Sequence, residues 1–348
     1  MGLFLIYKKD RRSDSLSKRG RVYNRIYNEQ EWNTVNEFNK NLLEDFLIEL
    51  ESNKKSKGTI NQYKNDMRII FIYILKKLQN KPITELNKKH FRNINLWFIN
   101  DLGLSSARCN RLMSAVRSML TFAEEDDDYD YEINYASKVK GLSKEAVREI
   151  YFLTDAQIER LRNELIKRKK YLHVLYLDLS YDSCARRNEC YQVLKENLLE
   201  RNYTNTVIGK RGKKFPLIYF DRTLESLKLY LKQRGEDEIP ELWVQKIGDE
   251  KRIITYNTLY SYIIQMANIL EEIEGEYIPF NPHSLRHSAL ENMNNGSHYI
   301  CKKIGKENGF SLEELKVLAN HSDISTTSSY LRNKDTDILE GMFGIKLK

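Results

Sequence analysis

Two stretches near the C-terminus decide the fold: PHSLRH at residues 282–287 and ANHSDISTTSSY at residues 319–330. In the first, His283 and Arg286 are three residues apart, so they lie on the same face of a helix. Asn-Pro at residues 281–282 supplies a cap and a first-turn proline, which begin that helix beside both side chains. Because a helix start carries partial positive charge, an arginine and a histidine there indicate a site for a phosphate.

The second stretch places Tyr330 nine residues after His321, with Leu331 and Arg332 following at once. The chain has 22 tyrosines, and a tyrosine with an ordinary pKa of about 10 is a poor nucleophile at neutral pH. A tyrosine or a His-x-x-Arg pattern alone therefore predicts little. The order and spacing of the pieces along the whole chain carry the functional prediction.

Length and composition favour a folded chain of two domains with an anionic partner. The chain has 348 residues, more than one ordinary core needs. Hydrophobic residues make up 41% of it, and the mean hydropathy is −0.61. The net charge is +8, from 57 basic and 49 acidic residues, and the pI is about 9.0. This basic balance favours nucleic acid as the partner.

The four cysteines, Cys109, Cys184, Cys190 and Cys301, are scattered and lack Cys-x-x-Cys spacing. This pattern predicts neither a zinc site nor a disulfide framework, and it fits a reducing cytoplasm. The apolar stretch at residues 3–7 is too short for the core of a signal peptide or for a membrane span. We therefore expect a cytoplasmic protein with no membrane contact.

The first half of the chain divides into a basic arm, residues 1–29, and a helical domain, residues 30–125. The arm carries clusters of lysine and arginine, and it is either a solvated tail or a segment that closes on phosphates. The domain shows apolar stripes at helical spacing, and its last helix turns Arg108, Arg111 and Ser114 away from the stripe. That polar face is either solvated or in contact with DNA, and the basic charge favours contact.

A run with six carboxylates breaks the helical pattern, so we expect a solvated acidic linker over residues 126–150. The second domain, residues 151–348, has one clear strand signal, on both sides of GKRGKK at residues 209–214. This turn carries four basic residues, and the strands are expected at residues 204–208 and 215–220. Residues 243–270 are amphipathic.

In this order the motifs resemble those of the tyrosine recombinases, the phage integrase family, over about residues 36–335. ARRNE at residues 185–189 is similar to the family's first arginine box. The match implies Arg186 as a catalytic residue and Glu189 as its acidic companion. VIGK, which ends at Lys210, resembles the hairpin segment that carries the family's catalytic lysine.

The remaining boxes follow in the family's order. His283 and Arg286 match the His-x-x-Arg box, His321 matches the second histidine, and Tyr330 stands at the usual spacing of the nucleophile. Residues 57–123 resemble the family's helical core-binding (SAM-like) domain. Further DNA contacts are expected from basic residues beside the boxes: Arg187, Lys213 and Lys214.

The resemblance implies that the protein cuts and rejoins DNA through a 3′-phosphotyrosyl link, with no metal, no ATP and no other cofactor. Two guanidiniums suit the negative charge that builds on the nonbridging oxygens of a phosphodiester under attack. His283 is expected to act as a base for the Tyr330 hydroxyl, and His321 to hydrogen-bond the phosphate. Lys210 is expected to protonate the departing 5′ oxygen.

The chain departs from the family's pattern at two turns. The family usually has Thr-Gly before the small residue and first arginine, where this chain has Ser-Cys at residues 183–184. Arg187 is therefore the alternative to Arg186. The family's Leu-Gly-His is Ala-Asn-His here, and a capping box at residues 311–314 predicts a helix that ends near Asn320. Asparagine is the best residue after glycine for a left-handed cap.

The resemblance implies a mainly α fold with a small β-hairpin sheet (α+β), in which the two domains form a C-shaped clamp around DNA. The expected partners are double-stranded DNA with paired half-sites, further copies of the chain and DNA-bending accessory proteins. A free monomer would assemble as a homotetramer on the DNA of the nucleoid. The apolar face of residues 337–348 is expected to pack either on the catalytic domain of its own chain or on a neighbouring subunit. Two alternatives stay open: a catalytically silent DNA-binding regulator, such as a phage-type repressor, and a type IB topoisomerase-like enzyme.

Overall fold

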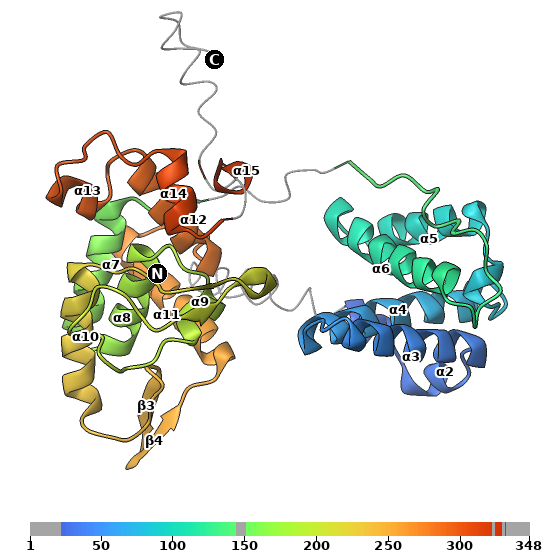
Figure 1. Cartoon of the computed structure of the whole chain (residues 1–348), viewed down its shortest axis with the longest axis horizontal. Helices are drawn as coiled ribbons and strands as arrows, with labels where there is room; N and C mark the ends of the chain where they lie inside the picture. Colours follow the sequence, from blue (N-terminus) through green and yellow to red (C-terminus); the bar gives the residue numbers. More distant parts are fainter. Residues whose placement is uncertain (1–21, 144–150, 322–323, 329–330, 332–348) are drawn as a thin grey trace, which may run out of the picture. The chain divides into compact units, whose positions relative to one another are not determined.

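The computed structural model describes residues 22–143, 151–321, 324–328 and 331. Met1–Glu149 and Ile150–Lys348 form two compact units (Figure 1). Each unit has its own hydrophobic core. Three predicted features lie outside the described residues: most of the basic arm, the nucleophile Tyr330 and the apolar C-terminal face. None of the described helices is long and apolar enough to cross a membrane.

Within residues 22–143, the regular secondary structure of the first unit is helical, as predicted. Its elements are α2 (Glu29–Asn33), α3 (Glu37–Ser52), α4 (Lys57–Lys77), the 3-10 turn η1 (Ile83–Glu85), α5 (Lys88–Asn100) and α6 (Ser106–Glu125). The predicted apolar stripes are confirmed, because Leu42 and Phe46 of α3 and Met67 and Ile70 of α4 are buried. Packing of these stripes against α6 builds the first core.

The predicted arm, residues 1–29, is wrong at its C-terminal end. Residues 22–26 are helical and belong to the folded unit. The Arg68 guanidinium of α4 lies over the rings of Tyr27 and Trp32, at 4.9 and 5.0 Å from their centroids. This cation–π contact holds the segment on α4, and the charge pattern of the arm gave no sign of it.

The predicted solvated linker, residues 126–150, is wrong for the segment that follows the acidic run. Its carboxylates are mostly exposed, but Tyr131 and Val139 are buried in the first core. Arg117 Nη2 donates to the Val139 carbonyl at 2.9 Å, and Asn134 Nδ2 donates to the Arg117 carbonyl at 3.1 Å. The segment after the acidic run therefore folds back on α6.

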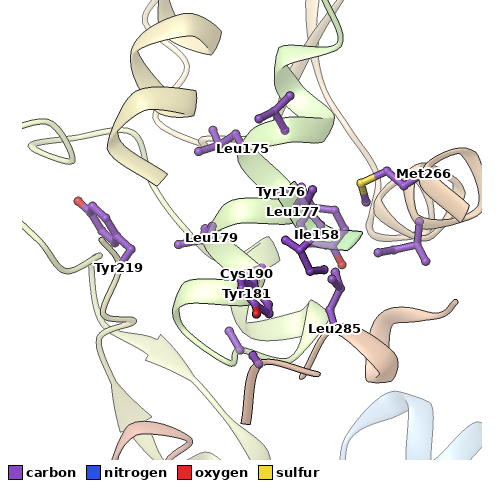
Figure 2. Packing of buried hydrophobic residues seen from close by; sticks show 14 of the residues in the cluster. Ile158, Leu175, Tyr176, Leu177, Leu179, Tyr181, Cys190, Tyr219, Met266 and Leu285 are labelled. Carbon is purple, nitrogen blue, oxygen red and sulfur yellow. The ribbon is translucent and has the colours of Figure 1, made fainter. Parts of the chain in front are cut away.

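The second unit is built around one buried helix. Its elements are α7 (Asp155–Lys167), α8 (Tyr171–Asp182), α9 (Arg187–Tyr191), β1 (Val207–Ile208), the 3-10 turn η2 (Lys210–Gly212), β2 (Lys214–Phe215), α10 (Asp221–Arg234), β3 (Val244–Ile247), β4 (Glu250–Ile253), α11 (Tyr256–Glu274), α12 (Pro282–Asn294), α13 (Tyr299–Lys303), α14 (Leu312–Leu318) and α15 (Ile324–Ser328). Residues 172–182 of α8 are all buried, and α7, α10 and α12 pack around them. Figure 2 shows Leu177 of α8 in one core with Ile158 and Leu285.

Two antiparallel hairpins interrupt the helices. The predicted hairpin is confirmed in a shorter form, with Val207 opposite Phe215. The second hairpin pairs β3 with β4, with Val244 opposite Ile253. Its turn places Gly248 at a φ of +63°, which glycine adopts at little cost. The first part of the amphipathic stretch 243–270 therefore forms a hairpin, and the helix α11 begins only at Tyr256.

Candidate active site

The start of α12 has the predicted geometry. The Asn281 side chain accepts hydrogen bonds from the backbone N–H groups of His283 and Ser284, at 3.0 and 3.3 Å, and Pro282 occupies the first helical position. This cap places His283 in the first turn and Arg286 one turn later. The Arg286 side chain is only 1% exposed.

Arg286 is held by groups from distant parts of the chain. Its guanidinium donates to the carbonyl of Cys184 and, at 2.9 Å, to the carbonyl of Ala319. Nη2 also lies 2.5 Å from His321 Nε2. An arginine can only donate, so Nε2 is the acceptor and the proton of the neutral imidazole is on Nδ1. Nδ1 in turn lies 2.9 Å from the Thr327 hydroxyl, so both ring nitrogens of His321 are engaged.

The charges around His321 keep it neutral. Burial of the ring, followed by the positive charges of Arg286, Arg186 and Lys213, lowers the pKa of His321 to about 3. Desolvation of the ring and the basic neighbours His287, Arg286, Arg186 and Arg187 also lower the pKa of His283. A neutral imidazole has a lone pair with which to accept a proton. In His321 that lone pair accepts from Arg286, so His283 is the histidine suited to act as a base.

Glu189 joins the two catalytic arginines of the prediction. It is 2% exposed, and its Oε1 accepts from Arg186 Nη1 at 2.9 Å, while its Oε2 accepts from the Arg186 backbone N–H at 2.7 Å. The same Oε2 lies 3.9 Å from Arg286 Nη1. The Arg186 side chain remains 25% exposed, so it is accessible to a substrate. Arg187 instead lies over the Tyr256 ring, 4.0 Å from its centroid.

Both turns that depart from the family's pattern adopt left-handed backbone. Cys184 has a φ of +53° and Asn320 a φ of +56°, so the sequence prediction for Asn320 is confirmed. A cysteine in this conformation is strained, and its carbonyl is one of the acceptors that hold Arg286. The predicted capping box at the start of α14 is also present, between Ser311 and Glu314.

The β1–β2 hairpin lies against the arginine cluster. A Cβ on Gly209 would come within 2.7 Å of the Phe215 ring and 3.2 Å of Glu189 Oε1, so only glycine fits there. Lys210 follows directly, with an exposed side chain. From the same turn, Lys213 Nζ lies 3.4 Å from the Asn320 carbonyl, and Lys214 is exposed on β2.

The predicted residues of the first unit lie around a carboxylate that the sequence analysis missed. Asp66 is 2% exposed and accepts from Arg108 Nη2 at 2.6 Å and from Nη1 at 3.2 Å. Arg111 Nε lies 3.7 Å from the same carboxylate. Ser114 is exposed on the next turn of α6. The available signal was an acidic residue next to Met67 within the apolar stripe of α4.

The comparisons with known proteins cover both units. A family profile described as the phage integrase family matches residues 151–337, and one described as the N-terminal SAM-like domain of phage integrases matches residues 43–126. Tyrosine recombinase XerA of Pyrococcus horikoshii is 25% identical over 89% of this chain and 95% of its own length. Tyrosine recombinase XerD of Staphylococcus saprophyticus is 26% identical over 83% and 92%.

Solved structures show the same fold. XerH site-specific recombinase bound to a palindromic difH substrate superposes with a TM-score of 0.62, at 18% identity, over 82% of this chain and 79% of that one. A lambda integrase tetramer bound to a Holliday junction gives 0.61, at 16% identity, over 85% and 78%. Because the catalytic-domain profile alone spans more than half of the chain, the protein belongs to the phage integrase family and is a site-specific recombinase of the tyrosine type.

Proposed function

We propose that this recombinase cuts one DNA strand with Tyr330 and reseals it through a 3′-phosphotyrosyl intermediate. One observation carries the proposal: Arg186, Glu189, Arg286 and His321, from three separate segments, meet in one cluster. Burial and hydrogen bonds fix the cluster before substrate arrives. Preorganised donors of this kind stabilise the charge of a phosphoryl transition state.

The proposed reaction conserves the phosphodiester. The Tyr330 oxygen bonds to phosphorus as its proton passes to His283, whose lowered pKa keeps it neutral. The bond from phosphorus to the 5′ oxygen breaks, and Lys210 donates a proton to that oxygen. Arg186 and Arg286 bind the nonbridging oxygens throughout. The reverse sequence, with a 5′ hydroxyl from another strand, completes the exchange.

The assembly is proposed from the solved relatives. XerH is bound to its difH substrate, and lambda integrase forms a tetramer on a Holliday junction. We infer that this chain likewise binds duplex DNA with paired half-sites and works as a tetramer, with the two units forming a clamp. The apolar residues within 337–348 would link neighbouring subunits.

A suicide duplex tests the proposed chemistry. Sites bound by the full-length protein are first selected from random-sequence duplexes, and the selected site is then nicked beside the cleavage point. The wild-type chain should form a covalent adduct that survives denaturing electrophoresis. Tyr330→Phe should form none, whereas Tyr203→Phe, which changes an exposed tyrosine elsewhere on the second unit, should form it normally.

Three outcomes contradict the proposal. An adduct with Tyr330→Phe would identify another nucleophile. Site-selective binding without any wild-type adduct would indicate a silent regulator. Relaxation of a plasmid that lacks the selected site would indicate a topoisomerase.

A further inference from the structure

A buried carboxylate lies at the bottom of a groove between α4 and α6. Asp66 projects from α4 and also accepts a hydrogen bond from Gln62 Nε2 at 2.9 Å. The groove has a volume of about 400 Å³ and is lined by the carboxylate together with hydroxyl, amide and guanidinium groups. Two arginines against one carboxylate leave the cluster with a net positive charge, which suits an anionic ligand.

The two arginines play different parts in this cluster. Arg108 directs both terminal nitrogens at Asp66, and its side chain is 26% exposed. The nearest approach of Arg111 to the carboxylate is its Nε, at 3.7 Å, and its side chain is 57% exposed. In a planar guanidinium, the edge that carries Nη1 and Nη2 lies opposite Nε. With Nε as the atom nearest the carboxylate, the two-donor edge of Arg111 is on the far side of the guanidinium and is available at the groove.

Apart from Asp66 and Arg108, the surroundings of Arg111 are uncharged hydrogen-bonding groups. Thr59, Gln62 and Tyr63 of α4 and Ser114 of α6 line the same groove. Side chains of these types contact base edges and sugar-phosphate oxygens in DNA complexes. An exposed arginine paired with a buried carboxylate among such groups can make a specific bidentate contact.

We propose that Arg111 recognises a guanine in the major groove of each half-site and that Asp66 is the positioning residue that holds it. The inference rests on the proposed DNA-binding function, which it deepens by naming a base. Guanine presents two acceptors, O6 and N7, at the spacing of a guanidinium edge. Holding the arginine in advance removes part of the ordering cost of that contact. Arg108 serves to neutralise and orient Asp66.

Selection from random-sequence duplexes tests the assignment. The full-length wild-type protein, Arg111→Lys, Asp66→Asn and the control Arg92→Lys are each used to enrich bound duplexes, which are then sequenced. Arg92 is an exposed arginine of α5 in the same unit. The wild-type motif should contain one guanine position per half-site whose preference falls about tenfold in Arg111→Lys and Asp66→Asn. The other motif positions, and the whole motif of Arg92→Lys, should stay unchanged.

Arg111→Lys keeps the charge at an exposed position, so it separates recognition of a base from binding of a phosphate. An unchanged motif in Arg111→Lys overturns the proposal. Arg111→Ala supplies a second readout: weaker binding of all sequences alike, with the slope of log affinity against log salt smaller by about 0.9, identifies a phosphate contact and also overturns it.

Adduct formation on the nicked duplex separates failure of this inference from failure of the proposed function. Adducts formed by Arg111→Lys with an unchanged motif overturn the guanine assignment alone. A wild-type protein that enriches no motif and forms no adduct overturns both. Circular dichroism of Asp66→Asn checks that loss of the buried charge leaves the helices folded. If Asp66→Asn is unfolded, the motif selected by Arg111→Lys alone decides whether Arg111 recognises a guanine.

Discussion

Arg186 and Arg187 are adjacent in sequence and occupy different environments. Arg186 shares Glu189 with Arg286, whereas Arg187 is stacked on Tyr256. Lysine lacks the planar fork of arginine, so Arg186→Lys should slow single-turnover adduct formation about 10²- to 10³-fold at saturating protein. Arg187→Lys should weaken DNA binding and leave that rate nearly unchanged. The reverse pattern would make Arg187 the catalytic arginine.

The residues that sequence predicted best are those whose geometry is local. The Asn281 cap, the Ser311–Glu314 capping box and the left-handed Asn320 each depend on neighbours within a few residues. The positions of Asp66 and Cys184 depend on contacts with segments dozens of residues away. No periodicity in one sequence reports such contacts. The sequence therefore predicted the arginines and the nearby Glu189, but not Asp66 or the Cys184 carbonyl, which bind Arg108 and Arg286.

At the scale of elements, α13 begins with a buried histidine cap. His298 Nδ1 accepts from the Ile300 N–H at 3.2 Å, and the ring stacks on Tyr181 with centroids 4.3 Å apart. Burial lowers the pKa of His298 to about 3. As pH falls from 6.5 toward 3, His298 is protonated in the unfolded chain but stays neutral in the folded chain. The free energy of unfolding therefore decreases over that pH range.

Replacing His298 with asparagine isolates this effect. Asparagine keeps an acceptor for the helix cap and cannot titrate in this range. Between pH 7 and pH 5 the second unit of the wild type should lose about 2 kcal/mol more unfolding free energy than His298→Asn does. Urea unfolding at the two pH values measures the difference. Equal losses in both proteins would show that the histidine binds its proton as readily in the folded chain as in the unfolded chain.

Helices and strands were predicted correctly where a single hydrophobic pattern continued along the sequence. They were missed where a strand pattern ran directly into a helix pattern. The uniform apolar run that became α8 was recognised as buried, because α8 packs on every side. The stretch 243–270 joins a hairpin of two short, mostly polar strands to the amphipathic helix α11. The helical part of this stretch dominates its hydrophobic pattern, so the hairpin at its beginning was not predicted. Gly248-Asp249 between short strands was the turn signal that separated them.

At the scale of the whole molecule, the two hydrophobic cores are built from separate parts of the chain. One core draws its buried residues from Val22–Val139 and the other from Leu153–Ala319. Fragments 22–143 and 151–348 have about 120 and 200 residues, which is ordinary for domains that fold alone. Each fragment should therefore show its own cooperative urea transition by circular dichroism. A fragment 22–143 that unfolds without a sigmoidal transition would show that its core needs the second unit.

The same separation predicts how the fragments bind the selected DNA site. Contacts from the first unit and from the second unit are joined by one chain, so binding of one unit raises the effective concentration of the other. Each fragment alone should bind at least about 100-fold more weakly than the full chain, and mixing the fragments should restore little of the loss. Electrophoretic mobility shifts at fixed salt measure these affinities. Full affinity in one fragment would assign all of the binding energy to a single unit.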